Sequence, residues 1–176
     1  MTDRIVRQLV PKPDEADQRK PFSEFSAQPN LVLLGAPGAG KTHLFTEAAA
    51  ANGTRVTTRD FLNIPTFPSD TVLFIDALDE RRAGRGDQST IDAVVRKLFE
   101  VRPKRIRISC RESDWLGETD LAAFQPYFQQ AGGCVVLALE QLTLDEQCAV
   151  LTAQGMRDPK EFLKQARERE LERFPV

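Results

Sequence analysis

Residues 31–42 read LVLLGAPGAGKT, four large apolar residues followed at once by a glycine-rich segment that ends in lysine and threonine. The last eight, 35-GAPGAGKT-42, match the pattern G-x-x-x-x-G-K-[ST], which lies between a strand and a helix. Small residues let successive backbone N–H groups curl around a phosphate, and the start of the helix adds partial positive charge. In this interpretation Lys41 reaches the β- and γ-phosphates of a nucleotide, and the Thr42 hydroxyl ligates Mg²⁺. The candidate nucleotide-binding residues are Gly35, Ala36, Pro37, Gly38, Ala39, Gly40, Lys41, Thr42 and His43.

Further short apolar runs follow the first one along the chain. They are 55-RVTT-58, 72-VLFI-75, 105-RIRIS-109 and 134-CVVLAL-139. Continuous runs of valine, isoleucine and leucine fit strands that are buried on both faces of a parallel sheet. We therefore predict a mainly parallel sheet of five strands, the first of them at 31-LVLL-34.

Helical patterns separate and follow these runs. Residues 41–51 and 89–101 carry apolar side chains at helical spacing. Ser89 with Asp92 is placed as a capping box, Thr143 with Glu146 repeats the device, and Asp158 opens a last helix. Strands that alternate with helices predict an α/β fold, a three-layer sandwich with helices on both faces of the sheet.

The segment 72-VLFIDALDE-80 ends an apolar strand in three carboxylates. In a parallel α/β sheet the ligand binds outside the carboxyl ends of the strands. Asp76 ends its strand there and is the candidate for holding the magnesium of a bound nucleotide. Glu80 is our first candidate, and Asp79 our second, for the group that orients or deprotonates the attacking water. The alternative is a capped turn into 81-RRAGRGDQ-88, with the acids paired to Arg81 or Arg82.

This extended acidic pattern, seen as 73-LFIDALDE-80, resembles the Walker B segment of the NACHT-type NTPases, which belong to the STAND class of signalling ATPases. The next strand and turn, 106-IRISCRESDW-115, is similar to the sensor 1 segment of that family. Arg111 matches the arginine that faces the γ-phosphate there. A later segment, 139-LEQLTLDEQ-147, is similar to the lead into the family's helical subdomain.

The resemblance implies a P-loop NTPase core with strand order 5-1-4-3-2, bound ATP and Mg²⁺, and slow hydrolysis. It also implies a nucleotide-dependent switch that is coupled to self-association and to effector or sensor domains, in immunity or bacterial defence. We expect a lead-in segment over residues 1–29 that is loosely structured, the core over 30–140, and the start of the helical subdomain over 141–176. We also expect the chain to be truncated before the winged-helix domain, with effector and sensor domains missing.

Composition narrows the class of protein. The chain has 176 residues, 28% of them charged, and a net charge of −2, so it lacks the basic excess of a general nucleic-acid binder. It carries no run of about eighteen apolar residues that could span a membrane and no signal-peptide core, and we expect a cytoplasmic protein. Three cysteines without a C-x-x-C motif, and a single histidine, argue against a zinc site or a disulfide scaffold.

Three functions stay open on these residues. The first is an ATPase whose turnover operates a conformational switch, and the second is an interaction module that holds ATP or ADP with negligible turnover. The third is a small P-loop kinase, although kinases of this kind lack the D-x-x-D-E pattern. No N-K-x-D element is present, which favours adenine over guanine.

Other residues have weaker assignments. Arg85 is a candidate arginine finger that would act on a neighbouring subunit. Phe22 and Phe25 are candidates for the walls of an adenine pocket. Arg105 and Arg107 alternate with isoleucines, and we predict that they mark the solvent-exposed lower end of their strand.

Overall fold

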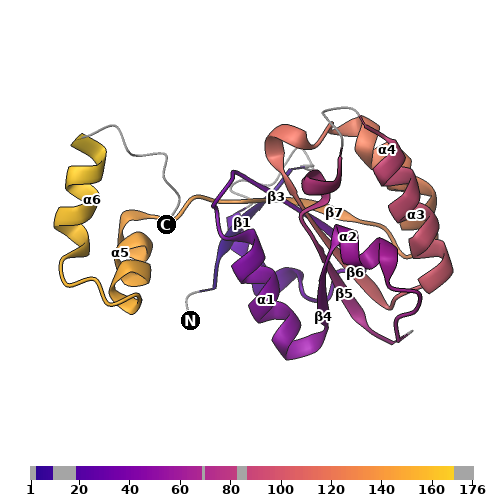
Figure 1. The fold of residues 1–176 in the computed structure, drawn as a ribbon, viewed down its shortest axis with the longest axis horizontal. Helices are drawn as coiled ribbons and strands as arrows, with labels where there is room; N and C mark the ends of the chain where they lie inside the picture. Colours follow the sequence, from indigo (N-terminus) through magenta and orange to yellow (C-terminus); the bar gives the residue numbers. More distant parts are fainter. Residues whose placement is uncertain (1–2, 10–18, 69, 83–86, 169–176) are drawn as a thin grey trace.

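The computed structural model describes residues 3–9, 19–68, 70–82 and 87–168, and their strands form one mixed sheet in the order β2-β1-β7-β3-β6-β5-β4 (Figure 1). The strands are β1 (Ile5–Gln8), β2 (Arg19–Pro21), β3 (Asn30–Gly35), β4 (Thr54–Thr57), β5 (Val72–Asp76), β6 (Arg105–Arg111) and β7 (Val135–Leu139). The block from β7 to β4 is parallel, whereas β1 runs antiparallel to both β7 and β2.

The sheet differs from the predicted one in strand number and in full order. The prediction has five strands, which correspond to the block β7-β3-β6-β5-β4, and the structure adds two strands beyond β7. Both come from the part of the chain that we expected to be loosely structured. β1 hydrogen-bonds to the edge of β7, and Val6 is fully buried at its centre. The lead-in therefore covers an edge that would otherwise expose unpaired backbone groups.

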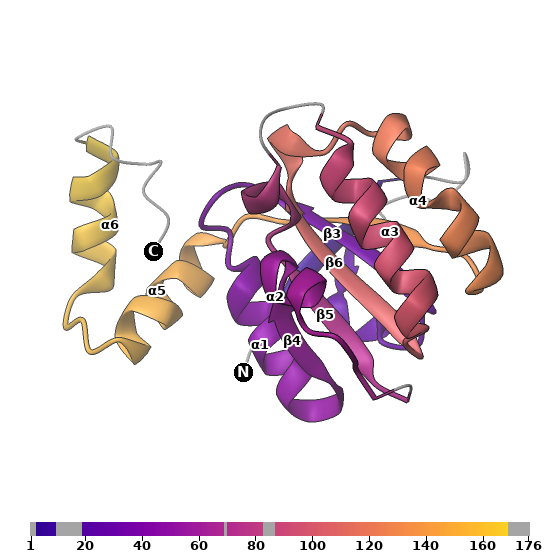
Figure 2. The ribbon, with the colours of Figure 1, turned by 45° about the vertical axis from the view of Figure 1, so that its right-hand side comes forward.

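Two hydrophobic clusters cover the two faces of the sheet. On one face, α1 (Lys41–Asn52) and the 3₁₀ helix η1 (Phe22–Phe25) pack on alternate strand residues such as Leu31 and Leu33. On the other face, α2 (Thr58–Asn63), α3 (Ser89–Val101) and α4 (Glu118–Gln130) pack on the intervening residues, such as Val32 and Leu34 (Figure 2). The side chains of β3 are thus buried on both sides, as its continuous apolar sequence predicts.

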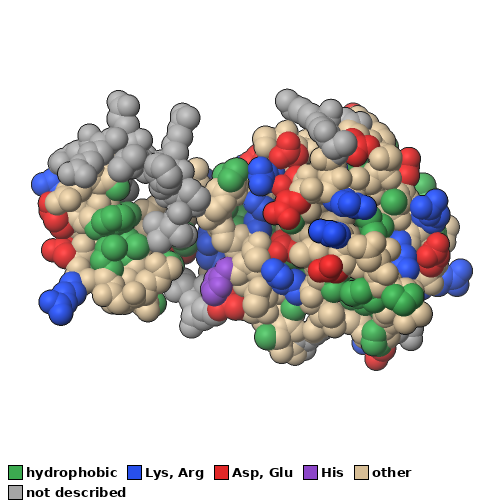
Figure 3. Space-filling view, in the orientation of Figure 1, with side chains coloured by type: hydrophobic (Ala, Val, Ile, Leu, Met, Phe, Trp, Pro, Cys, Tyr) green, Lys and Arg blue, Asp and Glu red, His purple; other side chains and the backbone are tan. Residues whose placement is uncertain are grey.

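The last two helices extend away from the sheet (Figure 1). They are α5 (Leu144–Ala153) and α6 (Pro159–Glu168). The capping box of Thr143 and Glu146 is present with both of its bonds, and Asp158 accepts a hydrogen bond from the Glu161 N–H. Hydrophobic side chains lie exposed on these helices, among them Leu144 and Phe162 (Figure 3).

The predicted capping box of Ser89 and Asp92 is wrong. The N-cap of α3 is Gln88, and its side chain does not cap the helix. Asp87 instead accepts hydrogen bonds from the Ser89 N–H, at 3.0 Å, and from the Ser89 hydroxyl, at 2.6 Å. The box fails because Asp87 accepts the Ser89 N–H that Asp92 would bind, and the Asp92 N–H donates to the carbonyl of Gln88.

Arg107 also corrects a prediction, because its side chain is buried. Its guanidinium donates to the carbonyls of Ser26, Gln28 and Pro29, at 2.9, 2.8 and 3.2 Å. Burial lowers the pKa of Arg107 to about 10, and the charge of Arg105 acts in the same direction. Arg107 therefore fixes the turn before β3 to the amino end of β6.

None of the helices in the described ranges has the length and apolar character of a membrane span.

Candidate functional site

The loop between β3 and α1 has the backbone of a phosphate cradle. Gly38 and Gly40 have φ angles of 73° and 91°, in the left-handed region that favours glycine. Gly40 is the N-cap of α1, and no side chain of the described residues caps the helix there. The first N–H groups of α1 are therefore directed at the loop, where they can bind an anion.

Lys41 is the first residue of α1, and its side chain folds back on this loop. Its ammonium donates to the carbonyls of Gly35, at 2.7 Å, and Ala36, at 3.0 Å. Burial lowers the pKa of Lys41, and the Asp79 carboxylate is the largest influence that opposes the shift, with Asp76 acting in the same direction. The lysine is thus close enough to both acids to interact with them.

A residue that the sequence did not single out supports the loop. Arg4, just before β1, donates to the carbonyls of Ala39, at 3.0 Å, and Glu140, at 2.7 Å. Burial lowers the pKa of Arg4, and the charge of Glu146 opposes this shift. Arg4 therefore ties the phosphate loop to the end of β7 through the lead-in segment.

Asp76 is fixed at the carboxyl end of β5, with 3% of its surface exposed. The Ser109 hydroxyl donates to its Oδ1 at 2.5 Å and accepts a hydrogen bond from the Ala77 N–H at 2.9 Å. Ala77 has a φ of 60°, so the chain turns sharply directly after the acid. Asp76 shares its side of the strand with Phe74, which packs under α1, and so it faces the helix that carries Thr42.

The other oxygen of Asp76 has a cationic neighbour. Arg55 of β4 places its Nε 3.4 Å from Asp76 Oδ2. Register puts Thr57 beside Asp76 and Arg55 beside Phe74, so Arg55 lies on the same face of the sheet. The sequence shows Arg55 only as part of a weak strand, and nothing local indicates this pair.

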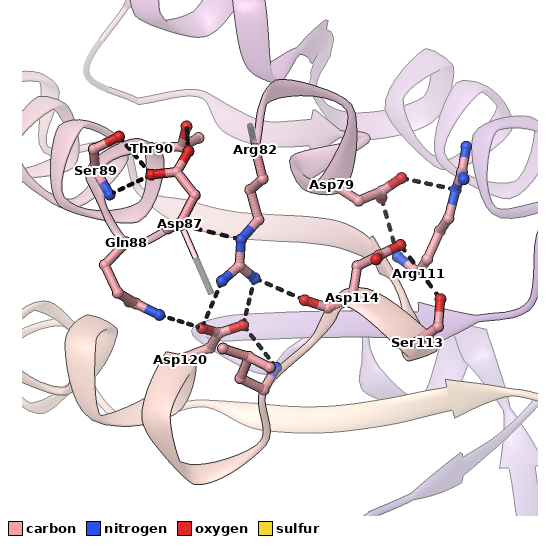
Figure 4. A network of polar contacts seen from close by, with 11 residues as sticks. Asp79, Arg82, Asp87, Gln88, Ser89, Thr90, Arg111, Ser113, Asp114 and Asp120 are labelled. Carbon is pink, nitrogen blue, oxygen red and sulfur yellow. Dashed lines mark hydrogen bonds and ion pairs between the residues drawn. The ribbon is translucent and has the colours of Figure 1, made fainter. Parts of the chain in front are cut away.

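Asp79 and Arg111 form a second ion pair (Figure 4). Arg111 Nε lies 2.8 Å from Asp79 Oδ2, and the Arg111 N–H donates to Oδ1 at 3.0 Å. The Asp79 side chain is 7% exposed and that of Arg111 46%. Glu80, on the same 3₁₀ helix η2 (Leu78–Arg81), is exposed, and no hydrogen bond or ion pair within the described residues fixes its carboxylate.

A buried network holds the segment that follows these acids (Figure 4). Arg82 donates to both oxygens of Asp120, at 2.8 and 3.2 Å, and to the Asp114 carbonyl at 2.7 Å. Gln88 and the Leu116 N–H also donate to Asp120. Arg82 therefore binds Asp120, and not Asp79 or Glu80 as in the alternative that the sequence offered. The network joins the end of η2 to the starts of α3 and α4.

Replacing Asp120 with asparagine is expected to lower the free energy of unfolding by about 2 kcal/mol, since it removes the charge that the buried Arg82 guanidinium faces. Urea denaturation measures the effect. Asp92→Asn, at an exposed acid on α3, is the control and should change stability by less than about 0.5 kcal/mol. Equal stability of the two variants would contradict a structural role for the network.

The remaining candidate site residues from the sequence are His43, Phe22, Phe25 and Arg85. His43 is exposed and lies 3.3 Å from Glu47 on the next turn of α1. Phe22 and Phe25 are the two ends of η1 and are buried against the sheet, and Phe22 lines a cavity of about 630 Å³ that extends beneath α1 to Val72 and Arg105. The Phe22 N–H donates at 2.8 Å to the carbonyl of Arg4, the residue whose side chain contacts the phosphate loop. Arg85 lies outside the described residues.

The residues present fit a magnesium ion that is bound together with a nucleotide. Within the described residues no group of three or more histidine, cysteine, aspartate or glutamate side chains could hold a metal. Asp76 supplies one buried carboxylate, and Thr42 supplies a hydroxyl in the first turn of α1. Mg²⁺ in nucleotide sites takes one or two such ligands and completes its shell with phosphate oxygens and water.

Comparison with known proteins shows the fold. The sequence matches no family model and no curated protein. AMPPCP-bound DnaA from Aquifex aeolicus has a TM-score of 0.50 with 15% identity, over 77% of this chain and 49% of that one. DnaA bound to AMPPCP and single-stranded DNA has a TM-score of 0.49 with 16% identity, over 80% and 50%. A DNA replication initiation factor has a TM-score of 0.49 with 15% identity, over 73% and 45%.

The chain therefore spans about half the length of these solved structures. At 15% identity the likeness to the Aquifex protein shows an α/β fold like that of a P-loop ATPase domain. It does not extend to the narrower NACHT-type assignment.

Proposed function

We propose that this protein binds ATP with Mg²⁺ at the carboxyl edge of the sheet and hydrolyses it slowly. The observation that carries the proposal is the position of the Lys41 ammonium, which donates to the Gly35 and Ala36 carbonyls of the glycine-rich loop, at the edge of the sheet where the buried Asp76 ends β5. The presence of AMPPCP, a triphosphate analogue, in a protein of similar fold supports the same assignment.

In this proposal the loop and its lysine bind the phosphates. Lys41 leaves the carbonyls of Gly35 and Ala36 and donates to the β- and γ-phosphates, where its charge has a stronger acceptor. Thr42 and Asp76 would hold the magnesium ion, which would neutralise charge on the phosphate oxygens. Asp76 is well suited to this role because Ser109 fixes its orientation.

The two acids beyond the strand have different roles. Asp79 is held by the backbone and the side chain of Arg111, so its carboxylate positions the arginine. Arg111 remains half exposed and is our candidate for contacting the γ-phosphate. Glu80 is the acid that can move to a water molecule without breaking an ion pair, and we assign it as the general base.

The nucleotide-holding module is the second candidate function. It is favoured by the ion pairs of Asp76 and Asp79, because two of the three acids already have arginine partners. Single-turnover kinetics separate the candidates: a slow ATPase releases ADP from every site, whereas a holding module retains unhydrolysed ATP. The NACHT-type switch, self-association, effector domains and cytoplasmic location stay predictions from the sequence.

Exclusion of nucleic acid is also still a prediction. It rests on the net charge of −2, and one solved structure of similar fold contains single-stranded DNA.

Asp76→Asn is expected to weaken the binding of Mg·ATP by about tenfold or more while changing the binding of metal-free ATP much less, because the carboxylate acts on the metal. Calorimetric titration with ATP in excess Mg²⁺ and in EDTA measures both affinities. Asp92→Asn again serves as the control for loss of one negative charge. If Asp76→Asn lowers both affinities equally, Asp76 is a structural residue.

A further inference from the structure

Arg55 is a cation beside the acid that we assign to magnesium. Its Nε lies 3.4 Å from Asp76 Oδ2, and its side chain is 29% exposed. The Nε atom itself is buried, and within the described residues it has no hydrogen-bond partner. The contact is therefore an ion pair without the aligned hydrogen bond that makes arginine–carboxylate pairs strong.

The pair uses the oxygen of Asp76 that Ser109 leaves free. Ser109 donates to Oδ1, and Arg55 lies against Oδ2. A metal, or a water molecule of its shell, that approaches this carboxylate meets the positive charge of Arg55 as well as the negative charge of the acid. At a partly buried site such a repulsion is screened less than in bulk water.

Resting on the proposed function, we propose that Arg55 is a positioning residue that sets the affinity of the site for magnesium. Before the metal enters, Arg55 neutralises the buried Asp76 and keeps the end of β5 joined to β4. With magnesium bound, Arg55 would have to give up the Asp76 carboxylate that it pairs with here. Since the ion pair has poor geometry, the side chain can turn away without loss of a hydrogen bond. Arg55 thus makes the site bind a divalent cation only when phosphate oxygens of the nucleotide also serve as ligands.

The test measures binding rather than turnover. A fluorescent ATP analogue bound to the protein in EDTA is titrated with Mg²⁺, and the concentration for half of the signal change is compared between variants. Arg55→Ala is expected to lower this concentration by about tenfold, because it removes a competing unit charge. Affinity for the metal-free analogue should stay close to the parental value.

Two further variants at this position sharpen the result. Arg55→Gln keeps most of the side-chain length that packs along the sheet, and it should lower the magnesium concentration for half of the signal change as Arg55→Ala does. It takes the place of Arg55→Ala if the alanine variant folds poorly. Arg55→Lys keeps the charge and should stay near the parental magnesium dependence. Arg59→Ala, at an exposed arginine on the neighbouring helix α2, is the control for loss of one positive charge and should have no effect.

Epistasis separates this role from a purely structural one. In Arg55→Gln/Asp76→Asn, the magnesium dependence should equal that of Asp76→Asn alone, because Arg55 acts through Asp76. A parental magnesium dependence of Arg55→Ala and Arg55→Gln would overturn the inference. So would loss of affinity for the metal-free analogue, which would make Arg55 a phosphate ligand. Lack of any nucleotide binding by the parent protein removes the proposed function itself and this inference with it.

Discussion

Replacing Lys41 with alanine is expected to reduce the affinity for ATP by about two orders of magnitude or more, with the fold unchanged. The ammonium is the cation that lies inside the phosphate loop, where it bonds to two loop carbonyls. Arg111, which also lies near the site, is paired with Asp79. Removal of Lys41 therefore leaves phosphate charge that the backbone N–H groups of the loop must balance with only the magnesium and Arg111 to help them.

Isothermal titration of ATP into the two proteins, with Mg²⁺ present, measures this loss. Lys104→Ala provides a matched control, because Lys104 pairs with Asp70 at the amino end of β6, at the opposite edge of the sheet. It should bind ATP like the parent. Equal affinities for Lys41→Ala and the parent would remove the phosphate-loop assignment, since no other part of the proposal supplies that cation.

The loop could be predicted because its information is local. Eight consecutive residues specify both the left-handed glycines and the lysine, and the apolar strand before them specifies the sheet. Asp76 could be predicted for a related reason, since a carboxylate at the end of a buried strand needs a partner wherever the strand lies. The structure gives it Ser109 and Arg55.

Elements that depend on distant parts of the chain were missed or misplaced. β1 is only four residues long, and its partner β7 lies near the other end of the core. α4 is not among the predicted helices, because Pro126 lies in its interior and proline removes a backbone donor there. The helix nevertheless buries Phe124 and Phe128 against the core, and this packing outweighs the local preference.

The ion pairs show the same limit. The sequence offered Arg81 and Arg82 as partners of Asp79 and Glu80, because they are neighbours along the chain. In the structure Asp79 pairs with a residue 32 positions away, and Arg82 pairs with one 38 positions away. Strand register and the position of α4 decide these pairs, and neither is visible in a local pattern.

Glu80→Gln is expected to leave ATP binding intact and to slow hydrolysis by about 10²- to 10⁴-fold, the usual contribution of a general base. Glutamine keeps the length of the side chain and its hydrogen-bonding reach but cannot accept a proton. The exposed position of Glu80, without a fixed partner in the described part of the chain, lets it approach a water molecule at the γ-phosphate. Glu118→Gln, at an exposed acid that begins α4, should hydrolyse ATP at the parental rate.

Single-turnover hydrolysis of pre-bound ATP is the deciding measurement, because it isolates chemistry from nucleotide exchange. Asp79→Asn belongs in the same experiment. It weakens the ion pair to Arg111, so it should reduce the preference for ATP over ADP together with the rate, whereas Glu80→Gln should reduce the rate alone. A parental rate in Glu80→Gln with none in Asp79→Asn would make Asp79 the base despite its arginine partner. Parental rates in both would assign the two acids to the turn and would leave a protein that holds its nucleotide without hydrolysing it.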